Sequence, residues 1–535
     1  MFELSGRARA GWLAAAASLC FRVFDVSGRA WAGWWAAAVR PYCRVFDVSG
    51  RARAGWLAAA ACLCFLYLFG LSGIGVIGPD EARYASIGRE MAVSGDWVTP
   101  RLWGRPWFEK PALTYWMVAF GVGAGLGPEL GPRLPIALLS VGFLTFYYFA
   151  LRREFGRQAG LYASAILATS AGWLAFSQVA VTDLPMSACF SAAMLLALRW
   201  IETGGRRTLV AAGTLLGAAV LAKGLVPLAL AAPLVWFARR RIRQAWPGAV
   251  AFLAAAAPWY ALCWGRNGRA FFDEFIWRHH FERFATDSLA HQQPFWFYAP
   301  VLAAGLFPWT PLLAHLAGRA AVKDWKRQLL AAWVVFGLVF FSAATNKLPG
   351  YLLPLLPAVC ALMGIALAEG RGARWTLAAS ALLLALLPAI AAVLPGALLG
   401  GLRNAQLTGA QWTWLAPAAA LALAVWWLSR AGRPAPTPGL FLIAVFAAAG
   451  FTAVKVTASA RVDELATARP LWRAIAGRSP DVCVDQMHRA WRYGLNYYSV
   501  EPLPDCETAP RALRIWQQPG KPPTVESEDA ASPGR

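Results

Sequence analysis

The sequence predicts an all-α polytopic membrane protein with about thirteen transmembrane helices, and two observations support this. The 535 residues are 58% hydrophobic and only 15% charged, a balance that soluble domains do not have. Apolar runs of about 20 residues, the length that crosses a bilayer, recur along most of the chain. The predicted spans lie near residues 54–75, 133–150, 158–177, 184–201, 208–222, 225–237, 246–264, 295–315, 328–345, 351–368, 374–394, 413–429 and 438–456.

The basic residues predict the orientation of these spans. The formal net charge of +22 comes from Arg and Lys clusters between the apolar runs, at residues 151–157, 238–244, 323–328 and 369–374. Such clusters are typical of cytoplasmic loops, so the charge orients the chain and does not indicate binding of nucleic acid. The stretch 111–127 is also apolar, but a full crossing there would break this charge rule. We therefore expect it to lie partly in the membrane interface.

The amino-terminal region contains three near-identical copies of one short segment, which begin at Ser5, Ser27 and Ser49. Only the third copy continues into an apolar run long enough to cross a bilayer. We therefore expect residues 1–44 to be a repeated extension that is dispensable for the fold. Residues 45–456 would then form the transmembrane domain, with an amino terminus in the cytoplasm.

The carboxy-terminal tail is predicted to lie on the extracytoplasmic side of the membrane. Apolar and polar residues alternate in "DVCVDQMHRAWRYGLNYYSV" (481–500), which predicts a small extracytoplasmic α/β domain over residues 457–517. Residues 518–535 are polar and proline-rich, which predicts disorder. Cys483 and Cys506 could pair in an oxidising compartment, or both could be free thiols.

The polar loops that lack basic clusters would all lie on the outer face. They are residues 78–110, 178–183, 223–224, 265–294 and 345–351. In the first loop, Asp80 and Glu81 open the stretch "DEARYASIGREM", whose apolar residues have the spacing of a short surface helix. At a helix start the two carboxylates could simply complement the helix dipole. However, the same loop ends with another acid–base pair, Glu109 and Lys110.

Further charged residues on the same face favour chemistry over simple capping. Asp183 begins an apolar span, where a lone carboxylate is costly and usually functional. Lys223 lies at a break between two short helices, and "NKLPGY" adds Lys347 and Tyr351. Two separated carboxylates with several cations suit a reaction on an anionic lipid headgroup. The cations would stabilise a departing phosphate while a carboxylate deprotonates the acceptor.

The motifs that carry these residues resemble a known family. They are "DEARYASIGREM…SGDW…WFEKP", "TDLP", "AKG", "HHFERFATDSLAHQQPFWFY" and "FSAATNKLPGYLLP". In this order, across residues 54–370, they resemble the bacterial lipid-to-acceptor glycosyltransferases of the GT-C fold. The branch with the lipid A 4-amino-4-deoxy-L-arabinose transferase is the most similar, and protein O-mannosyltransferases are more distant. The far C-terminal part resembles the family only in its layout.

This resemblance implies a membrane enzyme that moves a sugar from a polyprenyl (undecaprenyl) phosphate carrier to an extracytoplasmic acceptor, with inversion and without a nucleotide cofactor. The acceptor would be lipid A or another cell-envelope glycolipid, and the enzyme a monomer in the inner (plasma) membrane with its active site on the periplasmic face. Protein O-glycosylation by the same fold remains an alternative. A secondary transporter, a different class, would carry its ionisable residues mid-membrane on broken helices and show internal symmetry, which we do not find in the sequence.

The resemblance also implies roles for individual residues. Asp80 corresponds to the acid of the first loop, which acts as the base or positions the acceptor, and Asp183 to a second cavity carboxylate. Lys110 and Arg283 correspond to cations on the carrier phosphate. The complete predicted set of substrate contacts is Glu81, Arg83, Tyr84, Lys110, Lys223, Arg283, Lys347 and Tyr351.

Histidine usage suggests a metal. Three of the five histidines, His279, His280 and His291, lie in the 265–294 loop. Neutral imidazole and carboxylate groups are common ligands of Zn²⁺. The resemblance suggests Glu109, His280 and His291 as ligands of a structural Zn²⁺ or another divalent ion that joins two loops. The alternative is that these histidines hydrogen-bond to lipid or to the loop backbone.

Overall fold

The computed structural model describes residues 50–275, 293–317, 322–370, 373–401, 414–429 and 437–527. The chain divides into two compact units, Met1–Cys62 and Leu63–Arg535. The described part of the first unit is the start of helix α3 (Gly50–Leu68). The second unit contains the remaining helices and strands, and the candidate site lies within it.

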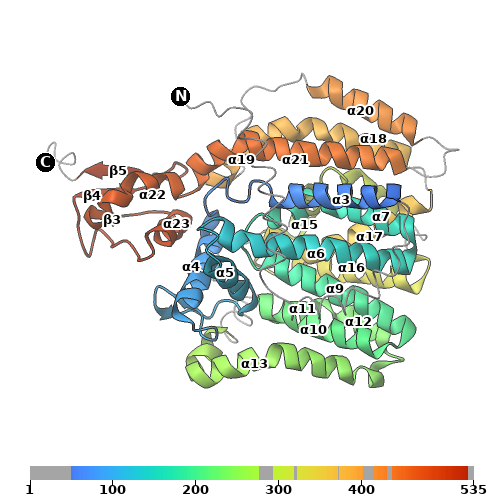
Figure 1. Cartoon of the computed structure of the whole chain (residues 1–535), viewed down its shortest axis with the longest axis horizontal. Helices are drawn as coiled ribbons and strands as arrows, with labels where there is room; N and C mark the ends of the chain where they lie inside the picture. Colours follow the sequence, from blue (N-terminus) through green and yellow to red (C-terminus); the bar gives the residue numbers. More distant parts are fainter. Residues whose placement is uncertain are drawn as a thin grey trace. The chain divides into compact units, whose positions relative to one another are not determined.

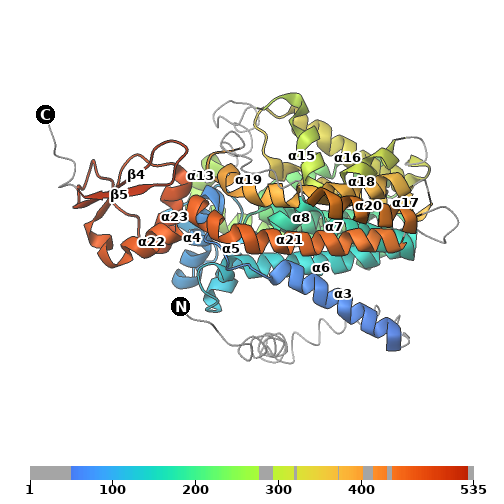
Figure 2. The same cartoon turned by 90° about the horizontal axis from the view of Figure 1, so that it is seen from above.

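The second unit is a bundle of apolar helices whose long members run side by side (Figures 1 and 2). Seven helical segments of the described chain are long and apolar enough to cross a membrane, and a bent pair, Phe295–Gly305 with Thr310–Leu316, would be an eighth. The bundle elements are α6 (Leu130–Phe155), α7 (Arg157–Ala168), α8 (Ala171–Phe176), α9 (Asp183–Thr203), α10 (Arg206–Lys223), α11 (Val226–Leu230), α12 (Ala232–Ala238), α13 (Trp246–Phe271), α15 (Tyr298–Gly305), α16 (Trp325–Ala343), α17 (Leu356–Ala368), α18 (Arg374–Leu383), α19 (Leu387–Gly400), α20 (Leu415–Leu428) and α21 (Thr437–Ala466). Short 3₁₀ segments connect them at η1 (Ile242–Gln244), η3 (Phe295–Phe297), η4 (Thr310–Leu316), η6 (Pro349–Leu355) and η7 (Leu384–Leu386).

The predicted all-α polytopic architecture is confirmed, and seven or eight of the predicted spans are long apolar segments among the described residues. Five predicted spans are shorter or interrupted helices: α3, α7 with α8, α10, α11 with α12, and α20. The interruptions have local causes. Gly224 adopts a φ of 75° between α10 and α11, which a glycine tolerates and other residues resist. Proline occupies the first turn of both α11 and α12, where it starts a new helix but cannot continue an old one.

The first predicted span, 54–75, ends earlier than expected, because α3 stops at Leu68. The carbonyl groups of residues 71–75 accept hydrogen bonds of 2.7 to 2.9 Å from the guanidinium groups of Arg133 and Arg469. Buried backbone carbonyls need partners, and here two arginines replace the bonds of a helix. The chain therefore leaves the bundle in a fixed loop just before the first polar segment.

One end of the bundle carries the first polar loop, and we call it the loop end (Figure 1). It consists of α4 (Gly78–Ser94), the two-residue strands β1 (Arg101–Leu102) and β2 (Arg105–Pro106), and α5 (Leu113–Gly123). The surface helix predicted from "DEARYASIGREM" is thus present as α4. With 11 residues, α5 is too short to cross a bilayer alone, in agreement with the interfacial placement of residues 111–127.

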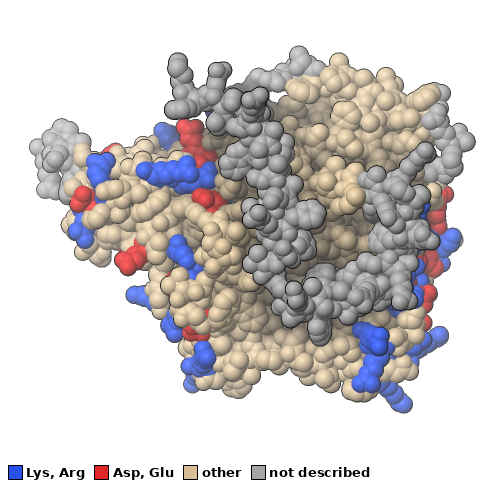
Figure 3. Space-filling view, in the orientation of Figure 1, with Lys and Arg blue, Asp and Glu red and all other residues tan. Residues whose placement is uncertain are grey.

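The opposite end carries the predicted basic clusters, and we call it the basic end. Helix α6 has 26 residues and α9 has 21, so each separates the two ends by about 30 to 40 Å. At the basic end Lys326 binds Glu154 and Glu202, both at 2.7 Å, and Arg327 binds Glu369 at 2.5 Å. Charged side chains gather at the two ends of the visible face, with a tan band between them (Figure 3). The clusters that the charge rule assigned to one side of the membrane therefore do share one end.

The carboxy-terminal part forms a small mixed domain. Helix α21 extends to Ala466 and is followed by α22 (Arg469–Ile475), η10 (Ala476–Asp481), β3 (Val482–Val484), α23 (Arg489–Ser499), β4 (Leu513–Trp516) and β5 (Thr524–Ser527). The sheet has the order β3-β4-β5, with β3 parallel and β5 antiparallel to β4. The small α/β domain predicted from the sequence is therefore present.

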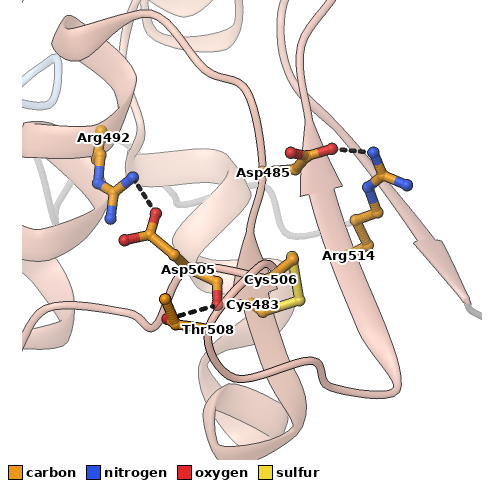
Figure 4. Close-up of a disulfide and its surroundings, with 7 residues drawn as sticks. All are labelled: Cys483, Asp485, Arg492, Asp505, Cys506, Thr508 and Arg514. Carbon is orange, nitrogen blue, oxygen red and sulfur yellow. Dashed lines mark hydrogen bonds and ion pairs between the residues drawn. A yellow bond between two sulfur atoms is a disulfide. The ribbon is translucent and has the colours of Figure 1, made fainter.

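Two details of this domain refine the prediction. Cys483 and Cys506 form a disulfide that joins β3 to the chain before β4 (Figure 4). The disorder predicted from residue 518 onward is wrong for the residues up to 527, because Thr524–Ser527 pairs with the whole of β4. The polar, proline-rich composition of this segment did not reveal that it pairs with β4 as an edge strand. Residues 528–535 lie outside the described part of the chain.

The large outer loop predicted at residues 265–294 begins close to a kink in α13. Gly268 has a φ of 57° and interrupts the helix, a short helical segment continues to Phe271, and residues 276–292 lie outside the described chain. The end of α13 contacts the first loop, since Arg266 binds the Asp96 carboxylate at 2.9 Å and the Asn267 amide donates to Thr99 at 2.9 Å. These contacts bring α13 to the loop end.

Candidate active site at the loop end

The first turn of α4 places two adjacent carboxylates in different surroundings. Pro79 occupies the first turn, which suits a helix start, and Asp80 and Glu81 follow where the helix dipole favours negative charge. The side chain of Asp80 is 48% exposed and pairs with the guanidinium of Arg83. Glu81 has no exposed surface at all. Only Asp80 can therefore reach a substrate from this turn without a rearrangement.

Glu81 is a structural residue and not the substrate contact that the resemblance implied. Both of its oxygens accept hydrogen bonds from Arg133 at 2.7 Å, in a pair that is completely buried. Oε2 also accepts from the Ile77 amide at 2.7 Å, and Oε1 from the Ala180 amide at 2.9 Å. With four donors the carboxylate has no remaining role for a ligand. It instead joins the start of α4, helix α6 and the segment before α9.

Arg83 contacts both carboxylates and several aromatic rings on the exposed side of α4. Its Nη2 pairs with Asp80, and its Nη1 lies 3.0 Å from Oε2 of Glu109. Its guanidinium carbon lies 5.3 to 5.9 Å from the ring centres of Tyr84, Trp107 and Tyr493. Burial alone would lower the pKa of Arg83, but the neighbouring Glu109, Tyr84 and Asp80 outweigh it and hold the pKa above its ordinary value. The arginine therefore stays charged between two carboxylates.

The end of the first loop adds a second cation. Nζ of Lys110 lies 3.4 Å from Oε1 of Glu109, so this carboxylate sits between Arg83 and Lys110. The loop is fixed by Phe108, which is buried and packs edge-on against Phe271 of α13 at 5.3 Å. Together Asp80, Arg83, Glu109 and Lys110 form one alternating chain of charges, which we call the α4 cluster.

The α4 cluster is backed by an aromatic layer. Tyr84 is buried and contacts Tyr115 edge-on at 5.7 Å. Burial raises the pKa of Tyr84 well above its ordinary value, so the phenol stays neutral. The predicted substrate contact at Tyr84 is therefore better described as a wall of the site, behind Arg83.

A second cluster forms where α9 begins and α10 ends. Asp183 is the first residue of α9 and Lys223 the last of α10, and Nζ of Lys223 lies 2.6 Å from Oδ1 of Asp183. The ammonium group also lies 4.8 Å from the ring centre of Tyr351. A Cβ atom at Gly350 would come within 2.3 Å of Oδ1 of Asp183, so only glycine allows this approach. The structure thus brings together three residues that were predicted from three separate loops.

Lys347 lies near this cluster in sequence but has a different environment. It is 6% exposed, and its Nζ donates to the carbonyls of Ala344 at 2.6 Å and Gln293 at 3.0 Å. Gln293 is the first described residue after the 276–292 segment. Lys347 therefore fixes the end of that loop, and these two bonds use two of the three donors of its ammonium group.

The two clusters are neighbours across a short segment. The amide of Ala180 binds Glu81 beneath the α4 cluster, and three residues later the chain reaches Asp183. Val181, between them, packs against the aromatic layer that contains Tyr84 and Trp107. The segment 180–183 thus links the surroundings of α4 to the second cluster.

The remaining predicted ligands fall outside the described residues, namely Arg283, His280 and His291, together with His279. In the described chain no group of three His, Cys, Asp or Glu residues could hold a metal ion. Glu109, the predicted carboxylate ligand, already faces Arg83 and Lys110. An ion bound at Glu109 would therefore have to replace one of these two positive groups, and the other two predicted ligands lie outside the described residues.

Sequence reasoning missed several residues that build the site. Arg133 was included in a predicted span without comment, although an arginine in the first turns of an apolar span is a strong signal of a buried partner. Tyr493 of α23 reaches Arg83 from the carboxy-terminal domain, and Asp463 of α21 accepts the Gly75 amide at 2.7 Å. No local signal in the sequence links these residues to the first loop.

Comparisons with known proteins agree with this arrangement. Residues 109–264 match the family model described as dolichyl-phosphate-mannose-protein mannosyltransferase. The structure superposes on ArnT from Cupriavidus metallidurans bound to undecaprenyl phosphate with a TM-score of 0.69 at 24% identity, covering 86% of this chain and 93% of ArnT. The apo state of ArnT gives a TM-score of 0.70. The chain has the GT-C fold of ArnT.

Curated relatives have similar sequences over part of their length. The chain is 36% identical over 321 residues to the undecaprenyl phosphate-alpha-4-amino-4-deoxy-L-arabinose arabinosyl transferase of Pseudomonas aeruginosa. It is 35% identical over 320 residues to an enzyme of the same description from Pseudomonas fluorescens. Each match covers 57% of this chain but only 58% and 54% of the two relatives. The chain thus spans little more than half the length of these relatives.

The family match covers part of the two clusters. The segment that matches the family model begins at Glu109 and contains Lys110, Asp183 and Lys223. Asp80 and Arg83 lie before this segment, in α4.

Proposed function

We propose that this membrane protein is a glycosyltransferase that moves a sugar from a polyprenyl phosphate carrier to an acceptor outside the cytoplasm, with inversion. The observation that supports it most is the α4 cluster: a half-exposed carboxylate, Asp80, held by Arg83 beside Lys110 at one end of an ArnT-like bundle. The relatives are named for undecaprenyl phosphate-linked aminoarabinose, so we propose this class of donor.

The proposed reaction follows from the charges. The carboxylate of Asp80 takes the proton of the acceptor hydroxyl, and the resulting oxygen forms the new bond to the anomeric carbon. The bond between the anomeric carbon and the phosphate oxygen breaks, and its electron pair stays on the phosphate. Lys110 stabilises the negative charge on the departing polyprenyl phosphate, because a charge-assisted contact strengthens as this charge develops. Attack opposite the leaving group gives inversion.

Asp183 and Lys223 would bind the sugar close to the reacting groups. Their pair lies at the helix ends, where the Asp183 side chain is 16% exposed. We propose that the Asp183 carboxylate orients hydroxyl or amino groups of the sugar. The ammonium group of Lys223 balances the negative charge of this carboxylate. The printed contact uses only Oδ1 of Asp183, so a sugar hydroxyl could donate to the carboxylate while the pair with Lys223 stays intact.

We further propose that the loop end faces the periplasm and the basic end the cytoplasm of an inner-membrane protein. The Arg and Lys clusters support the orientation of the basic end. The Cys483–Cys506 disulfide supports an oxidising compartment for the carboxy-terminal domain. In this orientation the active site would meet lipid-linked substrates at the outer surface of the membrane.

The acceptor we propose is lipid A or another cell-envelope glycolipid. The description of the matched family model, a protein mannosyltransferase, favours a protein acceptor as the second candidate. Two measurements separate them. Purified enzyme in detergent should transfer label from undecaprenyl-linked aminoarabinose to lipid A, and mass spectrometry should detect loss of the modified lipid A in cells without the gene. Label on protein alone would favour the second candidate, and solute uptake without transfer would favour a transporter.

The structural divalent ion remains a proposal that rests on His280 and His291. Metal analysis of the purified protein, with and without a His280→Ala and His291→Ala replacement, would test it. Near-stoichiometric zinc that disappears in the variant supports the ion. A metal-free wild-type protein with full thermal stability contradicts it.

A further inference from the structure

The carboxy-terminal domain inserts one side chain into the α4 cluster. The ring of Tyr493, on α23, stacks on Trp103 with centres 5.5 Å apart and an angle of 27°. The guanidinium carbon of Arg83 lies 5.3 Å from the centre of the same tyrosine ring and 5.8 Å from the indole ring of Trp107. Aromatic rings from the first loop and from a domain more than 300 residues later thus both contact this guanidinium.

This contact belongs to a tight docking surface. The guanidinium of Arg89 on α4 donates to the Tyr497 carbonyl at 2.6 Å, and the Tyr497 hydroxyl donates to the Pro128 carbonyl at 2.6 Å. A Cβ atom at Gly75 would lie 2.8 Å or less from three atoms of the carboxy-terminal part, including the Tyr498 hydroxyl oxygen. The domain is therefore packed against the loop before α4 and against α4 itself, with little freedom to shift.

The position of α23 within its own domain is also fixed. Arg492 binds the Asp505 carboxylate at 2.5 Å, next to the Cys483–Cys506 disulfide (Figure 4). The Asn496 side chain accepts the Leu503 amide at 3.1 Å. The helix that carries Tyr493 is thus held to the cross-linked segment on the side away from the bundle.

The charges of the α4 cluster explain why Arg83 needs such support. Its two terminal nitrogens hold Asp80 and Glu109, and no hydrogen-bond partner for its Nε exists among the described residues. Arginine has a long side chain that loses much rotational freedom when it is ordered. An aromatic face beside the guanidinium restricts this rotation and adds a cation–π attraction.

We propose that Tyr493 is a positioning residue of the active site, which holds Arg83 in the orientation that keeps Asp80 ready for the acceptor. The inference rests on the proposed function for the role of Asp80. The carboxy-terminal domain is then part of the catalytic unit, because it supplies one wall of the Arg83 site. Tyr493 itself acts through Arg83 and takes no part in the bond changes.

The kinetic test compares three variants of the full-length enzyme in detergent. Tyr493→Leu removes the ring, Tyr493→Phe keeps it, and Tyr498→Phe is a control on the same helix that loses a hydroxyl bonded to Val76 and Glu129 but leaves Arg83 untouched. We expect kcat of Tyr493→Leu to fall about tenfold, with little change in KM for the lipid-linked donor. Tyr493→Phe and Tyr498→Phe should retain most of the wild-type kcat. Wild-type kcat in Tyr493→Leu, or an equal loss in Tyr493→Phe, would overturn the proposal.

A second measurement separates this proposal from the proposed function. Hydrogen exchange of the substrate-free protein should rise in residues 78–94 and 101–110 of Tyr493→Leu and stay unchanged in α9. This readout does not require any transfer activity, so an inactive wild-type enzyme would contradict the proposed function and leave the positioning role measurable. Unchanged exchange in both segments would overturn the positioning role.

The pairing with Arg83 can be tested by a double-mutant cycle. If Tyr493 acts through Arg83, the Tyr493→Leu change should lower kcat much less in an Arg83→Lys background than in the wild type. Fully additive losses would show that Tyr493 acts independently of Arg83 and would contradict the proposal.

Discussion

The two faces of α4 use the same chemistry for different purposes. On the inner face, Glu81 and Arg133 are completely buried, and every oxygen of the carboxylate accepts hydrogen bonds. On the outer face, Asp80 and Arg83 form a pair whose carboxylate remains half exposed and whose guanidinium also serves Glu109. The adjacent residues Asp80 and Glu81 therefore differ in exposure and in the hydrogen-bonding capacity that remains for a ligand. The Glu81–Arg133 pair, whose carboxylate is fully hydrogen-bonded, stabilises the fold. The Asp80–Arg83 pair keeps an exposed carboxylate that can contact a substrate.

The largest effect should come from the exposed side of this comparison. Asp80→Asn removes the proposed base while it keeps the shape of the side chain, so transfer should fall by about two to four orders of magnitude. Asp183→Asn should also lower transfer strongly. Both proteins should express and melt close to the wild type, which thermal unfolding in detergent would check. Wild-type turnover in both variants would remove the assignment of these carboxylates.

Changes to the buried Glu81–Arg133 pair should lower the stability of the folded protein. Arg133→Met leaves the carboxylate of Glu81 without its partner, and the loss of one member of a buried pair costs about 3–5 kcal/mol. The double variant Glu81→Met with Arg133→Met removes both charges and should be more stable than Arg133→Met alone. Thermal melting of the three proteins measures this order. Equal stability of Arg133→Met and the wild type would show that the pair does not hold the loop end.

A smaller effect is expected at the cation beside Glu109. Lys110→Ala removes the proposed charge-assisted contact to the carrier phosphate, and such contacts are worth about 1.5–3 kcal/mol, so polyprenyl phosphate should bind roughly ten- to a hundredfold more weakly. Arg283→Ala should act in the same direction. Binding of undecaprenyl phosphate to the detergent-solubilised protein gives the affinity. Unchanged affinity in both variants would move the phosphate site elsewhere.

The smallest effect should follow removal of residues 2–44. The third copy of the repeat keeps Arg51 and Arg53 in front of the first span, so the orientation set by basic residues is preserved. The truncated protein should insert and transfer sugar much like the full chain. Membrane yield and transfer activity of the two forms give the comparison, and loss of insertion would assign the earlier copies to the fold.

The sequence predicted the location of the site better than the roles of its residues. Helical spacing revealed α4, and the cost of a lone carboxylate at an apolar span singled out Asp183. Both signals are local. The sequence could not separate Asp80 from Glu81, because burial of Glu81 depends on Arg133, which lies 52 positions away. The contribution of the carboxy-terminal domain was missed for the same reason, since Arg89 and Tyr497 are 408 positions apart.

The interruptions within the predicted spans were missed for a different physical reason. Apolar composition shows that a segment can lie in lipid, but not that one helix crosses it without interruption. Gly224 and the prolines that follow turn one apolar stretch into α10, α11 and α12. The break at Gly224 leaves Lys223 at the end of α10, next to Asp183. The same interruption that shortens this span therefore positions a residue of the second cluster.

The docking of the carboxy-terminal domain has a consequence for biosynthesis. Ribosomes make α4 long before α22 and α23, so the first polar loop is synthesised before the segments that contact Arg83 and residues 72–76. Until these segments have docked and Cys483 and Cys506 have paired, the loop lacks the groups that hold its carbonyls and its arginine. We expect nascent chains, and chains truncated before α22, to be inactive in the proposed transfer. Activity would begin only when α23 has docked on α4.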